Sequence, residues 1–206
     1  KGNDSILFEN PCDIAIGPMN LIYIANNDTQ KNILTFEVFQ DTIIPSPFQF
    51  PLNLSDKNEL LSICLDTEGN IYISAYNQET NQSDIYIYKS LSQDPAWPDS
   101  LSVSPALISR ITLPDNGVSK GHTVGPNGND IYVSNFDNGK IYHFHGTPET
   151  GYNLDSSFAV TIKEPLVNDT LTIETGPWGL YYLKEKNLLF CAAASEMILE
   201  MGEKKD

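Results

Sequence analysis

The stretch GPNGNDIYVSNFDNGKIYHF, residues 125–144, reads as two short strands joined by a tight polar turn. Apolar and polar residues alternate within it, a pattern typical of half-buried strands. The Asn138–Gly139 pair is a strong signal for a hairpin turn. Similar phrases occur at residues 17–36, GPMNLIYIANNDTQKNILTF, and at residues 66–88, DTEGNIYISAYNQETNQSDIYIY. The recurrence predicts a repeated β unit.

An aromatic residue anchors each copy of this unit and recurs every 49 to 60 residues, at Tyr23, Tyr72, Tyr132 and Phe190. A short apolar stretch precedes each anchor, and a further apolar strand follows it after a polar gap. In the last copy that further strand is predicted at 196–201. A fourth strand follows in three of the copies, at 46–54, 106–114 and 157–165. Each unit is therefore predicted to be a four-stranded antiparallel sheet.

Repeated four-stranded sheets of this length are the signature of a β-propeller. A lone four-stranded sheet exposes both faces to water, whereas sheets stacked around an axis cover one another. We expect one all-β domain over residues 1–206, a propeller with four blades in this chain. The blades are expected at about 11–54, 60–114, 120–165 and 177–206, with residues 5–10 closing the last blade. The alternative is that the chain is part of a larger propeller of five to seven blades.

The repeat resembles the blades of NHL and SMP-30/gluconolactonase-like propellers over roughly residues 10–200. Those families have Pro-x-Gly-hydrophobic-Ala-hydrophobic, a Gly or Asn turn, and then hydrophobic-Tyr-hydrophobic-Ala/Ser-Asp/Asn. The matching residues are Pro11, Ala15, Tyr23, Ala25, Asn26, Gly69, Asn70, Tyr72, Ser74, Gly128, Tyr132, Ser134, Asn135, Pro177, Trp178 and Gly179. They are turn formers and core fillers, so the resemblance is specific for architecture rather than for activity.

The resemblance to the lactonase branch implies one divalent cation, Ca²⁺ or a similar hard ion. In that branch a Glu, two Asn and an Asp hold the ion, which polarises a lactone carbonyl. The corresponding positions in this chain are Asp13, Ser62, Gly121 or His122, and Gly179. The chain departs from the family set, because Asp13 is the one carboxylate among them.

Composition limits the classes of partner. The 206 residues are 40% hydrophobic and 19% charged, which is typical of a globular domain. Twelve basic and 27 acidic residues give a net charge of −15, which disfavours nucleic acid and anionic lipid. No apolar run is long enough to span a membrane. We therefore expect neither a nucleic-acid partner nor membrane insertion.

Asn-x-Ser/Thr sequons in predicted loops favour an exported protein, either secreted or at the cell surface or in the periplasm. The candidate glycosylation sites are Asn27, Asn53, Asn81 and Asn168. The three cysteines, Cys12, Cys64 and Cys191, lie in or beside apolar stretches, where a free thiol behaves as a small core residue. Their odd number leaves at least one unpaired in a monomer.

Three residues are candidates for contact with a ligand: His122, Asp13 and Trp97. His122 occupies a place that aliphatic residues fill in the other units, which suggests a ring facing the central channel or, alternatively, a hydrogen-bonded core histidine. Trp97 lies in a long loop at 91–105 and could anchor a partner or pack over the blade edge.

His143 and His145 are candidates for a metal site, as is Asp13. The two histidines are two positions apart on a predicted strand and so share one face. With a carboxylate, for which Asp137 is nearest in sequence, they could chelate a transition metal. The alternative is a solvated polar face.

The sequence thus supports two functions of different classes. The first is an exported, non-enzymatic binding or scaffold propeller that recognises a protein or carbohydrate partner through loops at one end. The second is a divalent-metal-dependent hydrolase of the lactonase type, with Asp13 and His122 near the channel mouth. The motifs GxSxG and HExxH and a phosphate-binding glycine loop are absent from the sequence. Whether the chain is an enzyme stays open at this point.

Overall fold

The computed structural model describes residues 10–28, 32–40, 42–93, 105–165, 170–174, 176–183 and 185–194. These residues form antiparallel sheets and two short 3₁₀ turns, Pro18–Asn20 and Leu91–Gln93. The expected all-β class is confirmed. Within the described ranges, no helix has the length and apolar character needed to cross a membrane.

Three sheets have four strands each, and in each the strands are neighbours in chain order. Sheet 1 comprises β1 (Pro11–Ile16), β2 (Leu21–Asn26), β3 (Asn32–Phe39) and β4 (Thr42–Pro51). Sheet 2 comprises β5 (Asn58–Leu65), β6 (Ile71–Asn77), β7 (Gln82–Tyr88) and β8 (Leu107–Thr112). Sheet 3 comprises β9 (His122–Val124), β10 (Asp130–Asn135), β11 (Lys140–Thr147) and β12 (Gly151–Ala159).

The phrase at 125–144 becomes the turn before β10, then β10 and β11, with Ile131 paired to Phe144 and Asn135 to Lys140. The hairpin turn contains Gly139, whose φ of 62° lies in the left-handed region that glycine adopts without strain. The hairpin predicted from the apolar alternation and the Asn138–Gly139 turn is therefore confirmed.

Apolar side chains fill the space between neighbouring sheets, and sheet 2 is covered on both faces. Tyr86 and Tyr88 belong to a buried cluster shared with sheet 1, whereas Ile85 and Ile87 belong to a cluster shared with sheet 3. Because alternate residues of β7 point to opposite faces, one strand serves both cores. Neighbouring sheets therefore bury each other's apolar faces, as expected for the blades of a propeller.

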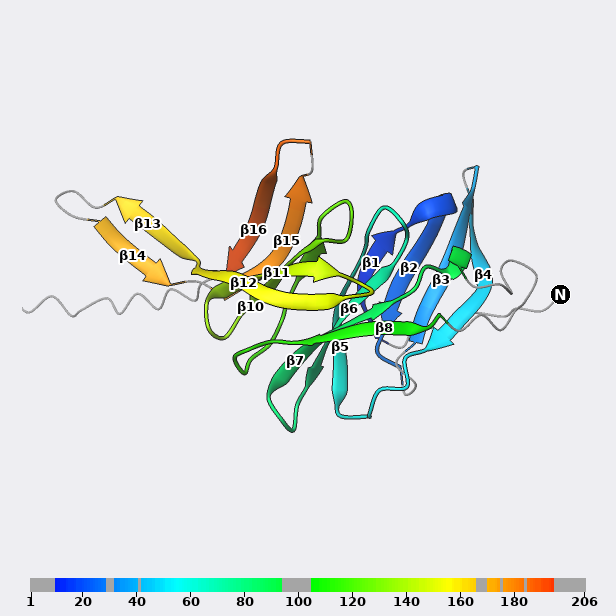
Figure 1. The fold of residues 1–206 in the computed structure, drawn as a ribbon, viewed down its shortest axis with the longest axis horizontal. Helices are drawn as coiled ribbons and strands as arrows, with labels where there is room; N and C mark the ends of the chain where they lie inside the picture. The colour runs from blue at the N-terminus through cyan, green and yellow to red at the C-terminus, as the bar shows by residue number, and fades with distance from the viewer. Residues whose placement is uncertain are drawn as a thin grey trace, which may run out of the picture.

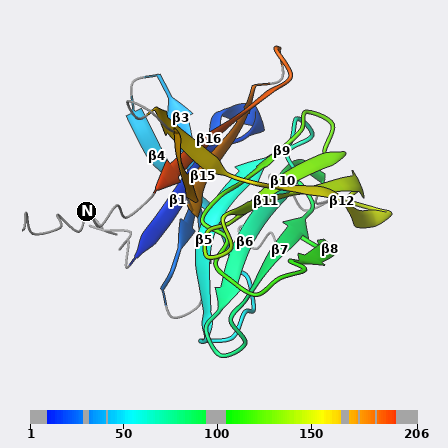
Figure 2. The ribbon, with the colours of Figure 1, turned by 90° about the vertical axis from the view of Figure 1, so that its left-hand side faces the viewer.

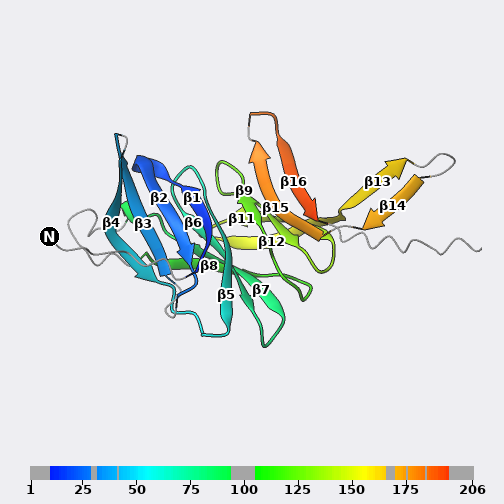
Figure 3. The ribbon, with the colours of Figure 1, turned by 180° about the vertical axis from the view of Figure 1, so that it is seen from behind.

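The first strands of successive units pack side by side: β1 against β5, β5 against β9, and β9 against β15 (Gly176–Leu183). β15 pairs with β16 (Leu188–Ala194) in a two-stranded sheet. Figures 1 and 3 show the sheets following one another along the long axis, with sheet 1 at one end. Figure 2 shows the sheets fanning out from the region of these first strands.

The segment at 157–165 differs from the expected single outer strand. β12 already completes sheet 3, since it pairs with β11 as far as Ala159 opposite Lys140. The chain then leaves the sheet, and β13 (Thr161–Pro165) pairs with β14 (Thr170–Glu174). This extra hairpin projects away from the sheets (Figure 1).

The expected last blade is described as the β15–β16 sheet alone. Its predicted third strand at 196–201 and residues 5–9 of the proposed closing strand lie outside the described residues. Ring closure therefore stays a prediction. The three cysteines are free thiols, and Cys12 is exposed rather than part of the core.

Candidate functional site

The first strands β1, β5, β9 and β15 line one cavity of about 410 Å³, which we call the inner-strand cavity. Its walls are mainly aliphatic, with Asp13, Cys64 and His122 among the polar residues. Each of the four units contributes to it, so it lies where a propeller has its channel. Loops and cavities at such places commonly hold ligands.

Strand register shows which residues of the four units are equivalent. Asp13 pairs with Ala25, Ser62 with Ser74, and Gly179 with Ala192, each directly after an irregularity in the inner strand. Gly121 occupies the same place in sheet 3, where its carbonyl accepts from the Ser134 amide at 2.9 Å. These are the four positions at which the family resemblance implies ligands for a metal.

The residues at the four positions do not fit a calcium site. Gly121 and Gly179 have no side chain, and the Ser62 hydroxyl is engaged with protein groups. Asp13 alone offers a carboxylate, whereas Ca²⁺ takes six to eight oxygen ligands. Among the residues that the structure describes, no group of three or more His, Cys, Asp or Glu is arranged to hold a metal ion.

Asp13 joins sheet 1 to sheet 2. One carboxylate oxygen accepts from its neighbour Ile14 at 2.8 Å, and the other accepts from the amide of Ile63 on β5 at 2.9 Å. Burial raises the pKa of Asp13 above its ordinary value, although these backbone N–H groups counteract it. The carboxylate thus lines the inner-strand cavity while both its oxygens already hold structural hydrogen bonds.

His122 packs against sheet 2, and both its ring nitrogens have partners. Nε2 lies 3.0 Å from the carbonyl of Tyr72, so this nitrogen carries the proton and donates. Nδ1 lies 2.5 Å from Oγ of Ser62, so it accepts from the hydroxyl. Burial lowers the pKa of His122 to about 4, although the Tyr72 carbonyl counteracts it. The ring is therefore neutral near pH 7, with no nitrogen left for a ligand.

Cys64 is the thiol of the inner-strand cavity. Burial, with the nearby carboxylates of Asp13 and Asp66, raises its pKa well above the ordinary value. A thiol kept neutral in this way is a poor nucleophile. The polar groups of the cavity are consequently better suited to shaping a binding site than to attacking a substrate.

The structure brings His143 and His145 together through Asp130 rather than through Asp137. One Asp130 oxygen lies 2.9 Å from Nε2 of His143 and 3.0 Å from Nδ1 of His145. Asp155 lies 3.1 Å from the other nitrogen of His143. Burial raises the pKa of Asp130, but hydrogen bonds from His145 and His143 outweigh it and leave the pKa below its ordinary value.

Asp137 instead accepts from the backbone amide of Val118 at 3.1 Å. Trp97 and Asn168 lie outside the described residues. Sequence reasoning missed the Ser62–His122 contact, because the two residues are 60 positions apart and nothing local links them.

Three of the candidate glycosylation sites are described, and they differ in accessibility. Asn27 uses its whole amide on sheet 2: Nδ2 donates to the Leu60 carbonyl at 2.8 Å, and Oδ1 accepts from the Leu60 amide at 2.7 Å. Asn53 and Asn81 are exposed. A glycan on Asn27 would replace a hydrogen of the donating amide and separate the sheets.

We therefore expect folded protein secreted by a eukaryotic host to carry glycans at Asn53 or Asn81 and none at Asn27. Glycopeptide mass spectrometry of the monodisperse fraction measures the occupancy of each site. Substantial occupancy at Asn27 in that fraction would contradict the expected role of its amide between the sheets.

Neither a protein-family model nor a curated protein sequence matches the chain. Solved structures do match. The periplasmic gluconolactonase of Pseudomonas aeruginosa superposes with a TM-score of 0.52 at 13% identity over 79% of this chain and 42% of that one. A proposed 6-phosphogluconolactonase of Bacteroides fragilis gives a TM-score of 0.51 at 11% identity over 80% of this chain and 39% of that one.

Hydrazine synthase of Kuenenia stuttgartiensis gives a similar TM-score, 0.51, at 10% identity over 87% of this chain and 42% of that one. Proteins with unrelated activities thus match equally well, so the likeness establishes the fold alone. It confirms the β-propeller architecture, with lactonase-like propellers among the neighbours. The chain spans 39–42% of the length of these three structures.

Proposed function

We propose that the chain is a binding module that recognises a protein partner through the inner-strand cavity. The proposal rests on the exposure of apolar side chains at this cavity. Ile14, Ile16 and Tyr181 line it, and 58%, 78% and 61% of their respective surfaces are open to solvent. Exposed apolar side chains around a concavity are typical of surfaces that receive an apolar side chain from a partner.

Charge complementarity points to a basic partner segment. The chain carries a net charge of −15, and Asp13 lies in the cavity wall. A peptide that inserts one branched or aromatic side chain and places Lys or Arg beside it would gain apolar burial and electrostatic attraction together. An exported protein would fit this proposal, since the described sequons at Asn27, Asn53 and Asn81 begin outside the strands and one structural neighbour is a periplasmic protein.

A peptide library displayed on phage tests the proposal. Selected peptides are expected to carry an apolar residue next to Lys or Arg, and to bind more weakly as salt increases. The substitutions Ile16→Ser and Tyr181→Ser should each weaken binding of a selected peptide roughly five- to tenfold, as for residues at an interface centre. Fluorescence anisotropy with the labelled peptide measures this change.

Leu154→Ser is the matched control, because Leu154 is 48% exposed on β12 and does not line the cavity. It should leave peptide affinity unchanged. Equal losses in all three variants, or peptides enriched without any basic residue, would refute this assignment of the site.

The fold of the neighbours favours a second candidate, a metal-dependent lactonase. Glucono-δ-lactone hydrolysis releases a proton and can be followed in a pH-stat with and without Ca²⁺. A Ca²⁺-dependent rate that disappears in Asp13→Asn would replace the binding proposal. A rate equal to that of buffer in the presence of Ca²⁺ would remove the lactonase candidate for this chain.

A further inference from the structure

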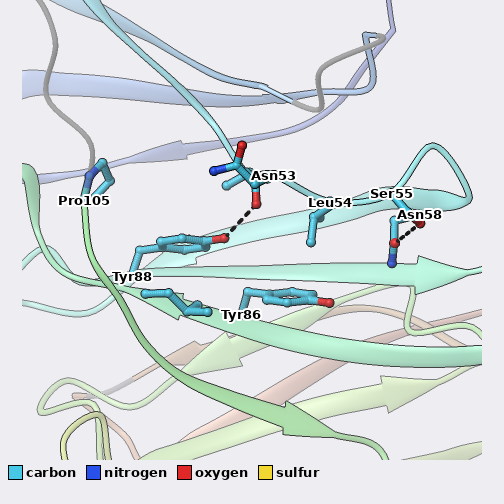
Figure 4. A pocket seen from close by; sticks show the side chains of 9 residues that line it. Asn53, Leu54, Ser55, Asn58, Tyr86, Tyr88 and Pro105 are labelled. Atoms are coloured by element: carbon cyan, nitrogen blue, oxygen red, sulfur yellow. Dashed lines mark hydrogen bonds between the residues drawn. The ribbon is translucent and has the colours of Figure 1, made fainter.

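A second cavity, also of about 410 Å³, is lined by sheet 2 and by the segment that joins sheet 1 to sheet 2, and it shares no residue with the inner-strand cavity. The loop at 52–55 and Asn58 form one side, and Tyr86 and Tyr88 form the other (Figure 4). Pro105 and Leu107 complete the lining. We call it the intersheet cavity.

The aromatic side of the intersheet cavity is held in place by neighbouring groups. Tyr86 and Tyr88 are two positions apart on β7 and so share one face. The Arg110 guanidinium carbon lies 5.4 Å from the centre of the Tyr86 ring, and Arg110 Nη2 lies 2.7 Å from the buried carboxylate of Asp84. The Tyr88 hydroxyl donates to the carbonyl of Leu52 at 3.4 Å. Tyr86 and Tyr88 are 9% and 7% exposed, so the fixed rings offer the cavity a narrow apolar edge rather than an open face.

Two hydrogen-bonding groups of this cavity have no partner among the described residues. The side-chain oxygen Oδ1 of Asn58 accepts a hydrogen bond from the Ser55 hydroxyl at 2.7 Å, which leaves the side-chain nitrogen Nδ2 free. Asn58 as a whole is 7% exposed, and this nitrogen is open to solvent in the cavity. The Tyr86 hydroxyl is also free, and Figure 4 shows it and the Asn58 nitrogen at the same end of the cavity. Because both groups are open to the cavity, they can form hydrogen bonds to a ligand that enters it.

The lining contains no ionised side chain in the part of the chain that the structure describes. An apolar edge of two tyrosine rings, an amide and a hydroxyl match a neutral sugar, whose C–H groups pack against apolar side chains and whose hydroxyls both donate and accept. The net charge of −15 opposes sugar acids and sugar phosphates. The volume also falls within the range of small-molecule sites.

We propose that the intersheet cavity binds a neutral pyranose ring. The sugar ring lies against the exposed edges of Tyr86 and Tyr88, and its hydroxyls bond to the Asn58 amide nitrogen and the Tyr86 hydroxyl. The sugar can come from a partner's glycan or from a glycan on Asn53, which lines the cavity and begins a sequon. Both sources present the same chemistry.

The first arm of the test uses protein made without glycosylation and three probes: the methyl glycosides of N-acetylglucosamine and glucose, and glucuronate. Saturation-transfer NMR should detect the neutral glycosides, and titration should show glucuronate binding more weakly. Tyr86→Phe and Asn58→Leu, which remove one hydrogen-bonding group each at nearly constant volume, should each weaken binding roughly five- to tenfold.

Tyr76→Phe is the matched control. Tyr76 lies in the same sheet, but its hydroxyl donates to Asn81 and does not line the cavity. It should leave sugar binding unchanged. Melting temperatures of the three variants establish that each remains folded.

The second arm uses protein from a secretory host. If a glycan on Asn53 occupies the cavity, the glycosylated protein should not bind the methyl glycosides, and Asn53→Gly should restore binding. If the sugar comes from a partner, both forms should bind. Either result supports sugar binding in the intersheet cavity and identifies where the sugar comes from.

The proposal is overturned if unglycosylated protein binds neither neutral glycoside. It is equally overturned if glucuronate binds as tightly as they do, or if both Tyr86→Phe and Asn58→Leu bind like the parent protein. These outcomes are independent of the peptide site, because Ile16 and Tyr181 do not line the intersheet cavity.

Discussion

Between pH 7 and pH 4 the protein should lose about 3 kcal/mol of unfolding free energy because of His122 alone. Burial lowers the pKa of this imidazole to about 4 in the folded chain, whereas the ordinary value is 6.5. Between these values the unfolded chain binds a proton that the folded chain does not. The stabilisation is therefore fully present above pH 6.5 and is lost as the pH falls towards 4, at about 1.4 kcal/mol per pH unit.

His122→Gln isolates this contribution from the titration of the many carboxylates. Glutamine can still donate to the Tyr72 carbonyl, but the Ser62 hydroxyl loses its acceptor. We expect the variant to be roughly 1–2 kcal/mol less stable than the parent at pH 7. The difference should disappear or reverse by pH 4, because the variant has no imidazole to protonate.

Urea unfolding of both proteins at pH 7, 5.5 and 4 measures the effect. Parallel pH profiles for the parent and His122→Gln would show that the imidazole titrates as freely in the folded chain as in the unfolded one. That result would contradict its position between Ser62 and Tyr72.

Gly121→Ala should destabilise the packing of β15 on sheet 3 by about 1–3 kcal/mol, the usual cost of overpacking. A Cβ at this position would lie 2.6 Å from the carbonyl oxygen of Trp178 and 3.0 Å from Cα of Gly179. Both atoms belong to the backbone of β15, so the clash is relieved only if the strand moves. Because β15 forms one wall of the inner-strand cavity, peptide affinity should decrease as well.

Gly125→Ala is the matched control within the same unit. Its Cβ would meet nothing closer than Cβ of Asp130 at 3.4 Å, an ordinary contact. Hydrogen–deuterium exchange should become faster in β15 and β16 of Gly121→Ala and stay unchanged in sheets 1 and 2. Equal exchange in both variants would mean that β15 does not pack closely on Gly121.

The repeat was predictable because its signals are local. Tyr23 and Tyr72 follow turn residues in equivalent phrases, and both are fully buried anchors between sheets. The family resemblance also placed Asp13, Ser62, Gly121 or His122, and Gly179 at corresponding positions. Strand register, with the Ser134–Gly121 hydrogen bond, supports this equivalence for Gly121.

The β13–β14 hairpin was not predictable from the repeat, since it has no counterpart among the described residues of the other units. Its strands pair only with each other, and the pattern at 157–165 gave no sign that the chain leaves sheet 3 after Ala159. The carboxylate that joins His143 and His145 was also misjudged: Asp137 is nearer in sequence, but Asp130 on the neighbouring strand β10 contacts both rings. Strand pairing, rather than sequence distance, decides which carboxylate is close.

The sequence by itself determined the β strands, their grouping into repeated units and the need for those units to cover one another, because each follows from apolar periodicity and turn residues over short stretches. The tertiary structure alone decided that His122 meets Ser62, that Asp13 bonds to Ile63, and that Asn58 and Tyr86 face one cavity with free polar groups. Such contacts depend on the angle and spacing at which whole sheets pack, and no local pattern encodes that geometry.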